Sequence, residues 1–223
     1  RKEKIMAFRQ IINKVLTRLR EETITSNWTG VINDSDDVDD YQKLIGEFVN
    51  EAKEVVEDSW NWGVLRSISS VTTEASTSTY TISALDSRSR ILQVIDDTNN
   101  SQLTQISDAQ FYHYTYIGTS SNTTPINYRL NSNTISFFPT PAGVYTIRVH
   151  AAQPQSDLTT ATEALTVPEN LVVLGAYSLA LNERGEDGGT ISDTAAQRFS
   201  NALNDAISQD SNRTVDETTW YAS

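Results

Sequence analysis

The stretch EDSWNWGVLRSISS, residues 57–70, marks the point at which the chain changes from helix to strand. Before it, apolar residues recur at spacings of three and four, and after it they alternate every second residue. Gly63 follows Trp60 and Trp62 and favours the end of a helix. Because two residues turn a helix by about 200°, we expect Trp60 to be buried among helices and Trp62 to pack at the helix–β boundary.

Two amphipathic helices are expected before this junction. In residues 3–20, and again from residue 41 to Trp60, apolar side chains return at helical spacing on one face. Charged pairs four residues apart, among them Lys53 and Glu57, are expected on the outer face of the second helix. The acidic run NDSDDVDD at 33–40 lacks the glycine that a calcium-binding loop needs, so we interpret it as a solvated linker and helix entry.

The middle of the chain has the short runs, rich in Thr, Val and Tyr, that are typical of an antiparallel β domain. Strands are expected at 65–73, 80–84, 90–96, 102–107, 111–117, 127–130, 134–138 and 144–151. The turn PTPAG at 139–143 predicts a hairpin between the strands beside it. In the run FYHYTYI, a strand would place Tyr112, Tyr114 and Tyr116 on one face. This aromatic face is expected to contact the core, another subunit or a sugar.

Helical periodicity returns after Pro168, and a second helical pattern covers about 191–209. Four amphipathic helices need apolar partners, so the two ends of the chain are expected to pack together as one bundle. The predicted fold class is α+β, with bundle halves at 1–62 and 156–209, an inserted β-rich domain at 63–155 and an extended tail at 210–223. Trp220 and Tyr221 near the end of the tail are expected to anchor it on another chain, because Trp and Tyr are common interface residues.

The composition argues against several classes of function. The chain has no cysteine, which excludes thiolate catalysis, disulfides and thiolate zinc sites. Its two histidines, His113 and His150, fall in predicted strands and show no triad pattern, so we expect no enzymatic activity, no cofactor and no metal. A net charge of −12 disfavours a protein that grips DNA. No apolar run is long enough to span a membrane.

Three stretches, in this order, carry a resemblance to a known family. They are FVNEAKEVVEDSWNWGVLRSIS at 48–69, TISFFPTPAGVYTIRVHAAQPQSDL at 134–158 and LTVPENLVVLGAYSLALNERGED at 165–187. Together they resemble the head-to-tail adaptor proteins of short-tailed bacteriophages, the tail tubular protein A type. No stretch is a catalytic signature, and the order of the parts is more specific than any one of them.

The resemblance implies a helical bundle with a central β insertion and no enzymatic activity. It also implies a homo-oligomeric ring of twelve subunits that joins the portal protein to the tail nozzle protein, located in the neck of the virion and assembled in the host cytoplasm. An acidic chain suits a channel lining along which DNA slides without sticking, because like charges repel. The alternative is a monomeric β-rich module that binds glycans through the face of Tyr112, Tyr114 and Tyr116.

Overall fold

The computed structural model describes residues 6–117, 122–185 and 189–213, and the chain forms two compact units. The helical unit combines Arg1–Val64 with Gln155–Ser223, and the β unit is Leu65–Pro154. The helices of the described residues are α1 (Phe8–Leu19), α2 (Asp40–Ser59), α3 (Asp108–Tyr116), α4 (Glu169–Arg184) and α5 (Thr190–Arg213). Two short 3-10 turns are η1 (Ile32–Asp34) and η2 (Gly63–Leu65). The predicted α+β class is confirmed, because helices from both ends of the sequence flank the central strands.

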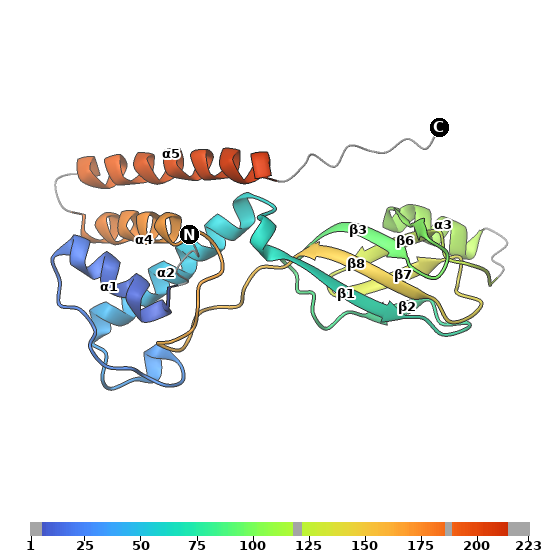
Figure 1. Ribbon diagram of the computed structural model, residues 1–223, viewed down its shortest axis with the longest axis horizontal. Helices are drawn as coiled ribbons and strands as arrows, with labels where there is room; N and C mark the ends of the chain where they lie inside the picture. Colours follow the sequence, from blue (N-terminus) through green and yellow to red (C-terminus); the bar gives the residue numbers. More distant parts are fainter. Residues whose placement is uncertain (1–5, 118–121, 186–188, 214–223) are drawn as a thin grey trace. The chain divides into compact units, whose positions relative to one another are not determined.

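Helix α4 is the centre of the helical unit, because it packs against α1, α2 and α5 (Figure 1). Gly175 permits this arrangement: a Cβ at that position would lie 2.9 Å from the Cβ of Ala52 on α2 and 3.3 Å from the ring of Phe199 on α5. The neighbouring buried residues Ala176 and Ala180 are also small. The close approach of α2 and α5 to α4 therefore depends on small side chains along α4.

The β unit consists of two four-stranded sheets. Its strands are β1 (Arg66–Thr72), β2 (Thr79–Thr81), β3 (Arg90–Asp96), β4 (Ser101–Gln102), β5 (Thr104–Gln105), β6 (Asn127–Asn131), β7 (Thr134–Phe138) and β8 (Thr146–Ala152). One sheet has the order β1-β8-β3-β4 and the other β2-β7-β6-β5, with β5 and β6 parallel. Side chains from both sheets, among them Val94, Ile135, Phe137, Ile147 and Val149, form one buried core. The unit is therefore a small β sandwich.

The hairpin predicted around PTPAG is wrong. Strand β7 pairs with β6 and β2, whereas β8 pairs with β1 and β3, so the chain crosses from one sheet to the other between them. The crossing is held by Thr73, whose hydroxyl donates to the carbonyl of Gly143 at 2.9 Å and accepts from the N–H of Tyr145 at 2.9 Å. These contacts join the connection between β7 and β8 to Thr73, which directly follows β1.

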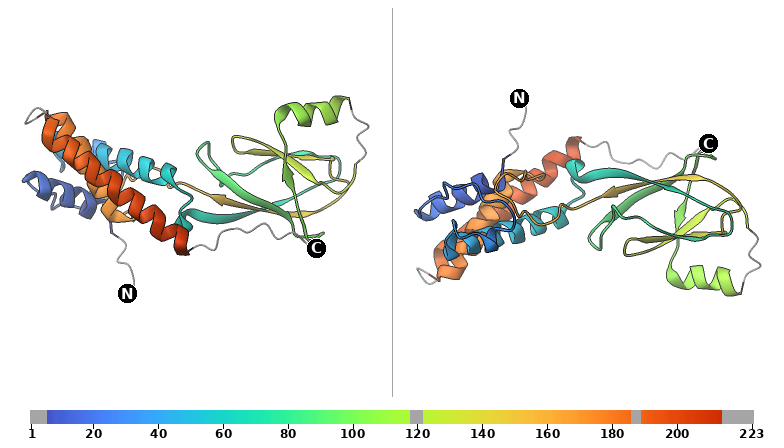
Figure 2. Two further views of the ribbon diagram at one scale, coloured as in Figure 1. Left: turned by 90° about the horizontal axis from the view of Figure 1, so that it is seen from above. Right: turned by 90° about the horizontal axis from the view of Figure 1, so that it is seen from below.

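The strand predicted at 111–117 is also wrong, because this region lies in helix α3 and the turn that follows it. Ser107 caps the helix by accepting from the N–H of Gln110 at 3.3 Å, while the side-chain oxygen of Gln110 accepts from the N–H of Ser107 at 3.2 Å. Asp108 in the first turn suits the positive end of the helix dipole. Helix α3 contacts β7 and lies on one side of the strands of its unit (Figure 2). The local capping box therefore outweighs the strand preference of the aromatic residues.

Candidate functional site

The junction between the two kinds of structure is built around both tryptophans, of which Trp62 is the more buried. Trp62 is 2% exposed, and its indole Nε1–H donates to the carbonyl of Val56 at 2.7 Å. Trp60 is half-buried, and its Nε1–H donates to Oδ2 of Asp210 on α5 at 3.1 Å. The N–H of Gly63 donates to the same oxygen at 3.1 Å. Asp210 therefore connects the end of α5 to the turn that leaves α2.

The expected positions of the two rings were derived by extending the helix through both of them. Helix α2 ends at Ser59, and Trp60 has extended backbone angles of φ −154° and ψ 158°. The chain then turns, so the helical angle between the two residues no longer applies. Trp62 returns to the last turn of α2, where its ring is covered and its N–H donates to the carbonyl of Val56, which also accepts from the hydroxyl of Ser59 at 2.6 Å.

A second correction concerns Lys53 and Glu57, which were expected on the outer face of α2. Both side chains are fully buried, and Nζ of Lys53 lies 3.7 Å from Oε2 of Glu57. Lys53 Nζ also donates to the carbonyls of Gln155 at 2.7 Å and Ser156 at 3.0 Å. Oε1 of Glu57 accepts from the N–H of Gln155 at 3.1 Å. The buried pair thus binds the backbone of the segment that follows the last strand.

Asn50 extends this contact by one further turn of α2. Its amide accepts from the N–H of Leu158 at 2.9 Å and donates to the carbonyl of Leu158 at 3.1 Å. We call Asn50, Lys53 and Glu57, together with the segment 155–158, the buried clamp. It satisfies backbone groups that have no helix or sheet partner at this point, and it fixes the segment that leads back to α4.

Helix α3 and the residue that follows it expose several large aromatic and apolar side chains. Tyr112 is 47% exposed, Tyr116 is 79% exposed and Ile117 is 75% exposed. The rings of Tyr112 and Tyr116 stack with centroids 5.9 Å apart. The guanidinium of Arg129 lies over the rings of Phe111 at 4.6 Å and Tyr112 at 5.0 Å. These stacking contacts hold the exposed rings in place.

The three tyrosines do not share one face, contrary to the prediction. Residues four apart meet on a helix and residues two apart do not, so Tyr112 and Tyr116 stack on each other while Tyr114 stacks on Phe138 with centroids 5.2 Å apart. The glycan-binding alternative relied on a strand with three aligned rings. That arrangement is absent from the described residues.

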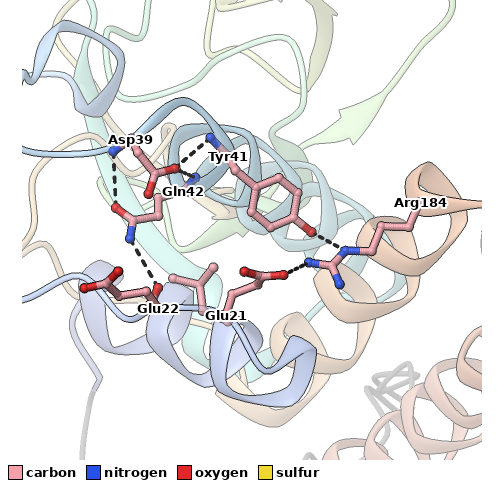
Figure 3. Close-up of a pocket in the computed structure, with 7 residues that line it drawn as sticks. Glu21, Glu22, Asp39, Tyr41, Gln42 and Arg184 are labelled. Atoms are coloured by element: carbon pink, nitrogen blue, oxygen red, sulfur yellow. Dashed lines mark hydrogen bonds and ion pairs between the residues drawn. The ribbon is translucent and has the colours of Figure 1, made fainter.

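A small polar pocket of about 290 Å³ lies where the end of α4 meets the connection between α1 and α2 (Figure 3). Nε of Arg184 donates to the hydroxyl of Tyr41 at 2.7 Å, and Nη2 donates to Oε1 of Glu21 at 2.5 Å. Burial alone would lower the pKa of Arg184, but the hydrogen bonds to Tyr41 and Glu21 outweigh it and raise that pKa above its ordinary value. Arg184 thus binds Tyr41 and Glu21, and these contacts hold the end of α4 against the connection between α1 and α2.

The other candidate groups show no assembled chemistry. His113 lies exposed on α3 with its ring 6.0 Å from that of Tyr114, and His150 is half-buried in β8. In the acidic run, Asp34 ends η1 and Asp39 caps α2 by accepting from the N–H groups of Tyr41 and Gln42. Among the described residues, no group of three His, Asp or Glu side chains could hold a metal ion, and no helix is long and apolar enough to cross a membrane.

The predicted tail is placed only in part. Residues 210–213 form the last turn of α5 instead of an extended chain. Trp220 and Tyr221, expected to anchor the tail on another chain, lie outside the described residues.

Comparison with known proteins gives one family. The model of the SU10 adaptor protein family matches residues 6–221, which is nearly the whole chain. No protein in a curated collection matches the chain. The family match confirms the resemblance to phage adaptors and indicates a structural component of the virion neck that associates with other virion proteins. The chain therefore belongs to the SU10 adaptor protein family, a family of structural phage adaptors.

Proposed function

We propose that this protein is a ring subunit that joins the portal protein to the tail nozzle protein and lines the channel through which DNA passes. The observation that carries the proposal, beside the family match, is the exposed aromatic surface of α3. Tyr112, Tyr116 and Ile117 are exposed, and large exposed apolar side chains on one element are typical of a protein interface. Tyrosine and arginine are also the residues most enriched at the centres of such interfaces.

The two units make different contacts in the assembly. The helical unit forms contacts between neighbouring subunits of the ring, which the resemblance implies has twelve members. The α3 surface, made of Tyr112, Tyr116 and Ile117, contacts the nozzle protein. The ring assembles in the host cytoplasm and remains in the neck of the virion.

The charge of the chain supports a channel role without sequence-specific DNA binding. The net charge is −12, and an oligomer multiplies this negative charge. Proteins that bind DNA tightly neutralise its phosphates with lysine and arginine. A negative lining instead allows the duplex to move past, because it offers no cation for the phosphates to bind.

The test combines the protein with the portal and nozzle proteins of its phage and follows assembly by electron microscopy and native mass spectrometry. We expect a closed ring on the portal that then accepts the nozzle. The variant Tyr112→Ser with Tyr116→Ser is expected to form the ring but to bind the nozzle at least about tenfold more weakly, as is usual when two aromatic interface residues are lost.

The matched control is Val144→Ser, because Val144 is 68% exposed on the same unit but lies outside α3. It is expected to bind the nozzle like the original protein. A chain that stays monomeric with the portal present would contradict the ring. Normal nozzle binding by the double tyrosine variant would contradict the role given to α3.

A further inference from the structure

The surface charges of the helical unit are divided between two helices. Helix α1, with the sequence FRQIINKVLTRL, contains Arg9, Lys14 and Arg18 and no acidic residue. Helix α2 contains six acidic and two basic residues, a formal charge of −4. In a chain with a net charge of −12, a helix with only basic charges is a local exception. The two helices therefore present surfaces of opposite charge.

The acidic residues of α2 are aligned. Asp40, Glu47, Glu51, Glu54 and Asp58 follow one another at spacings of seven, four, three and four, which places them on one face of the helix. The face of α2 that packs into the unit is a different one and holds its buried residues. We call these five acidic residues the acidic stripe. Asn33 donates to Oε1 of Glu47 at 2.6 Å, which orients that side chain.

A groove of about 600 Å³ lies between α1 and α4, and we call it the basic groove. Its charged lining residues are Lys14 and Arg18, its polar ones include Gln10 and Asn13, and Val173 contributes apolar surface. No acidic residue is among the described residues that line it. Lys14 forms an ion pair with Glu169 at 2.8 Å, yet 45% of its side chain stays exposed and within reach of a partner.

The two surfaces match in charge and in spacing. Lys14 and Arg18 are four residues apart on α1, as are Glu47 and Glu51 on α2, and four residues advance a helix by about 6 Å. We propose that the basic groove of one copy binds the acidic stripe of α2 in a second copy. The side-chain amide of Gln10 then donates a hydrogen bond to a carboxylate that the two cations do not reach.

The two surfaces lie on different elements of one rigid unit, so the contact is heterologous. Each copy uses its groove for one neighbour and its stripe for the other, and such a contact produces a closed ring when the rotation between copies closes. This inference rests on the proposed function, and it names the surfaces by which the ring subunits recognise one another. Its charged character also implies that ring formation weakens as the salt concentration rises.

The first test is a charge exchange. Two double variants each reverse the charge of one surface: Lys14→Glu with Arg18→Glu, and Glu47→Lys with Glu51→Lys. Each variant is expected to weaken ring formation on the portal about a hundredfold, because like charges then face each other. A chain that carries all four changes is expected to regain rings, since the complementary charges are restored with reversed sign. The matched controls, Arg198→Glu and Asp205→Lys, change exposed residues of α5 and should assemble normally. Circular dichroism checks that every variant is folded.

The second test uses the absence of cysteine, which makes any introduced pair unambiguous. Gln10→Cys lies in the basic groove, and Val55→Cys lies on an exposed position next to Glu54 in the acidic stripe. A mixture of the two single variants is expected to form a disulfide-linked dimer in assembled rings and not in free monomers. Arg198→Cys mixed with Val55→Cys provides the control and should remain uncrosslinked.

The outcomes separate this inference from the proposed function. Rescue by the four-residue exchange, together with the specific crosslink, supports it. Normal rings from either charge-reversed variant overturn it and leave the ring itself standing. Normal rings that no longer bind the portal or nozzle would show that the basic groove receives another protein, which also overturns it. If the unchanged protein forms no ring on the portal, the proposed function fails first.

Discussion

Replacing Lys53 with methionine should strongly destabilise the helical unit. The substitution keeps the length and apolar stem of the side chain but removes the ammonium group. That group is buried, pairs with Glu57 at 3.7 Å and donates to the carbonyls of Gln155 and Ser156. Lys53→Met therefore leaves a carboxylate without its buried cation and two carbonyls without a donor.

The size of the effect follows from this loss. Removing one partner of a buried ion pair costs about 3–5 kcal/mol, because the remaining charge stays in the interior without that partner. This is a large share of the roughly 5–15 kcal/mol by which domains are stable. The variant Lys53→Met with Glu57→Gln should recover about 1–3 kcal/mol relative to Lys53→Met alone. The glutamine removes the buried charge that has lost Lys53, while its oxygen still accepts from the N–H of Gln155.

Tryptophan fluorescence during urea unfolding is the suitable assay. The tryptophans are at positions 28, 60, 62 and 220, so none falls within the β unit at Leu65–Pro154. The signal therefore follows the helical unit even when the two units unfold separately. Unfolding curves are fitted for four chains: the original, Lys53→Met, Glu57→Gln and the double variant. This double-mutant cycle gives the coupling energy between Lys53 and Glu57 directly.

Lys43→Met on the same helix is the control. Lys43 pairs with Asp40 at 3.7 Å, but the Asp40 side chain is fully exposed, and exposed pairs contribute about 0–1 kcal/mol. A Lys53→Met chain that unfolds within about 0.5 kcal/mol of the original, the range of surface substitutions, would refute the buried clamp. Equal effects of Lys43→Met and Lys53→Met would refute it as well.

Three further predictions concern the junction, the β sandwich and the tail. Trp62→Ala should cost about 3–5 kcal/mol and Trp60→Ala less, because only Trp62 is fully covered; urea unfolding that ranks them in the opposite order would contradict this. Burial raises the pKa of Tyr128, so the stability that its neutral phenol contributes is present below its ordinary pKa of about 10 and is lost as the pH rises through the raised value. Alkaline unfolding should accordingly begin at higher pH in Tyr128→Phe. Deleting 214–223, which contains Trp220, should leave the melting temperature unchanged and weaken ring formation or portal binding; a lower melting temperature with normal assembly would place the tail on its own subunit.

Local periodicity was sufficient to predict four of the five described helices and several strands. The helical spacing of apolar residues identified α1, α2, α4 and α5, and the alternating runs at 90–96 and 134–138 coincide with β3 and β7. The pairing of the strands could not be predicted from local periodicity in the same way. The hairpin was predicted because β7 and β8 are neighbours in sequence, whereas their pairing depends on strands elsewhere in the chain, such as β1 and β6. A short turn rich in proline does not distinguish a hairpin from a crossing between two sheets.

The errors at the candidate sites have two physical origins. At α3 the sequence contained a signal for a helix, because Ser107 and Gln110 form a capping box. The aromatic run after it favours strands, and the strand was therefore predicted. At the buried clamp no local signal existed. Two opposite charges four residues apart normally face solvent, and here they are buried because the backbone of 155–158, about a hundred positions later, supplies acceptors and a donor for them. A charged residue can enter a core only where another segment completes its hydrogen bonds. The location of Lys53 and Glu57 therefore follows from the return path of the chain after β8, which the periodicity of α2 alone does not contain.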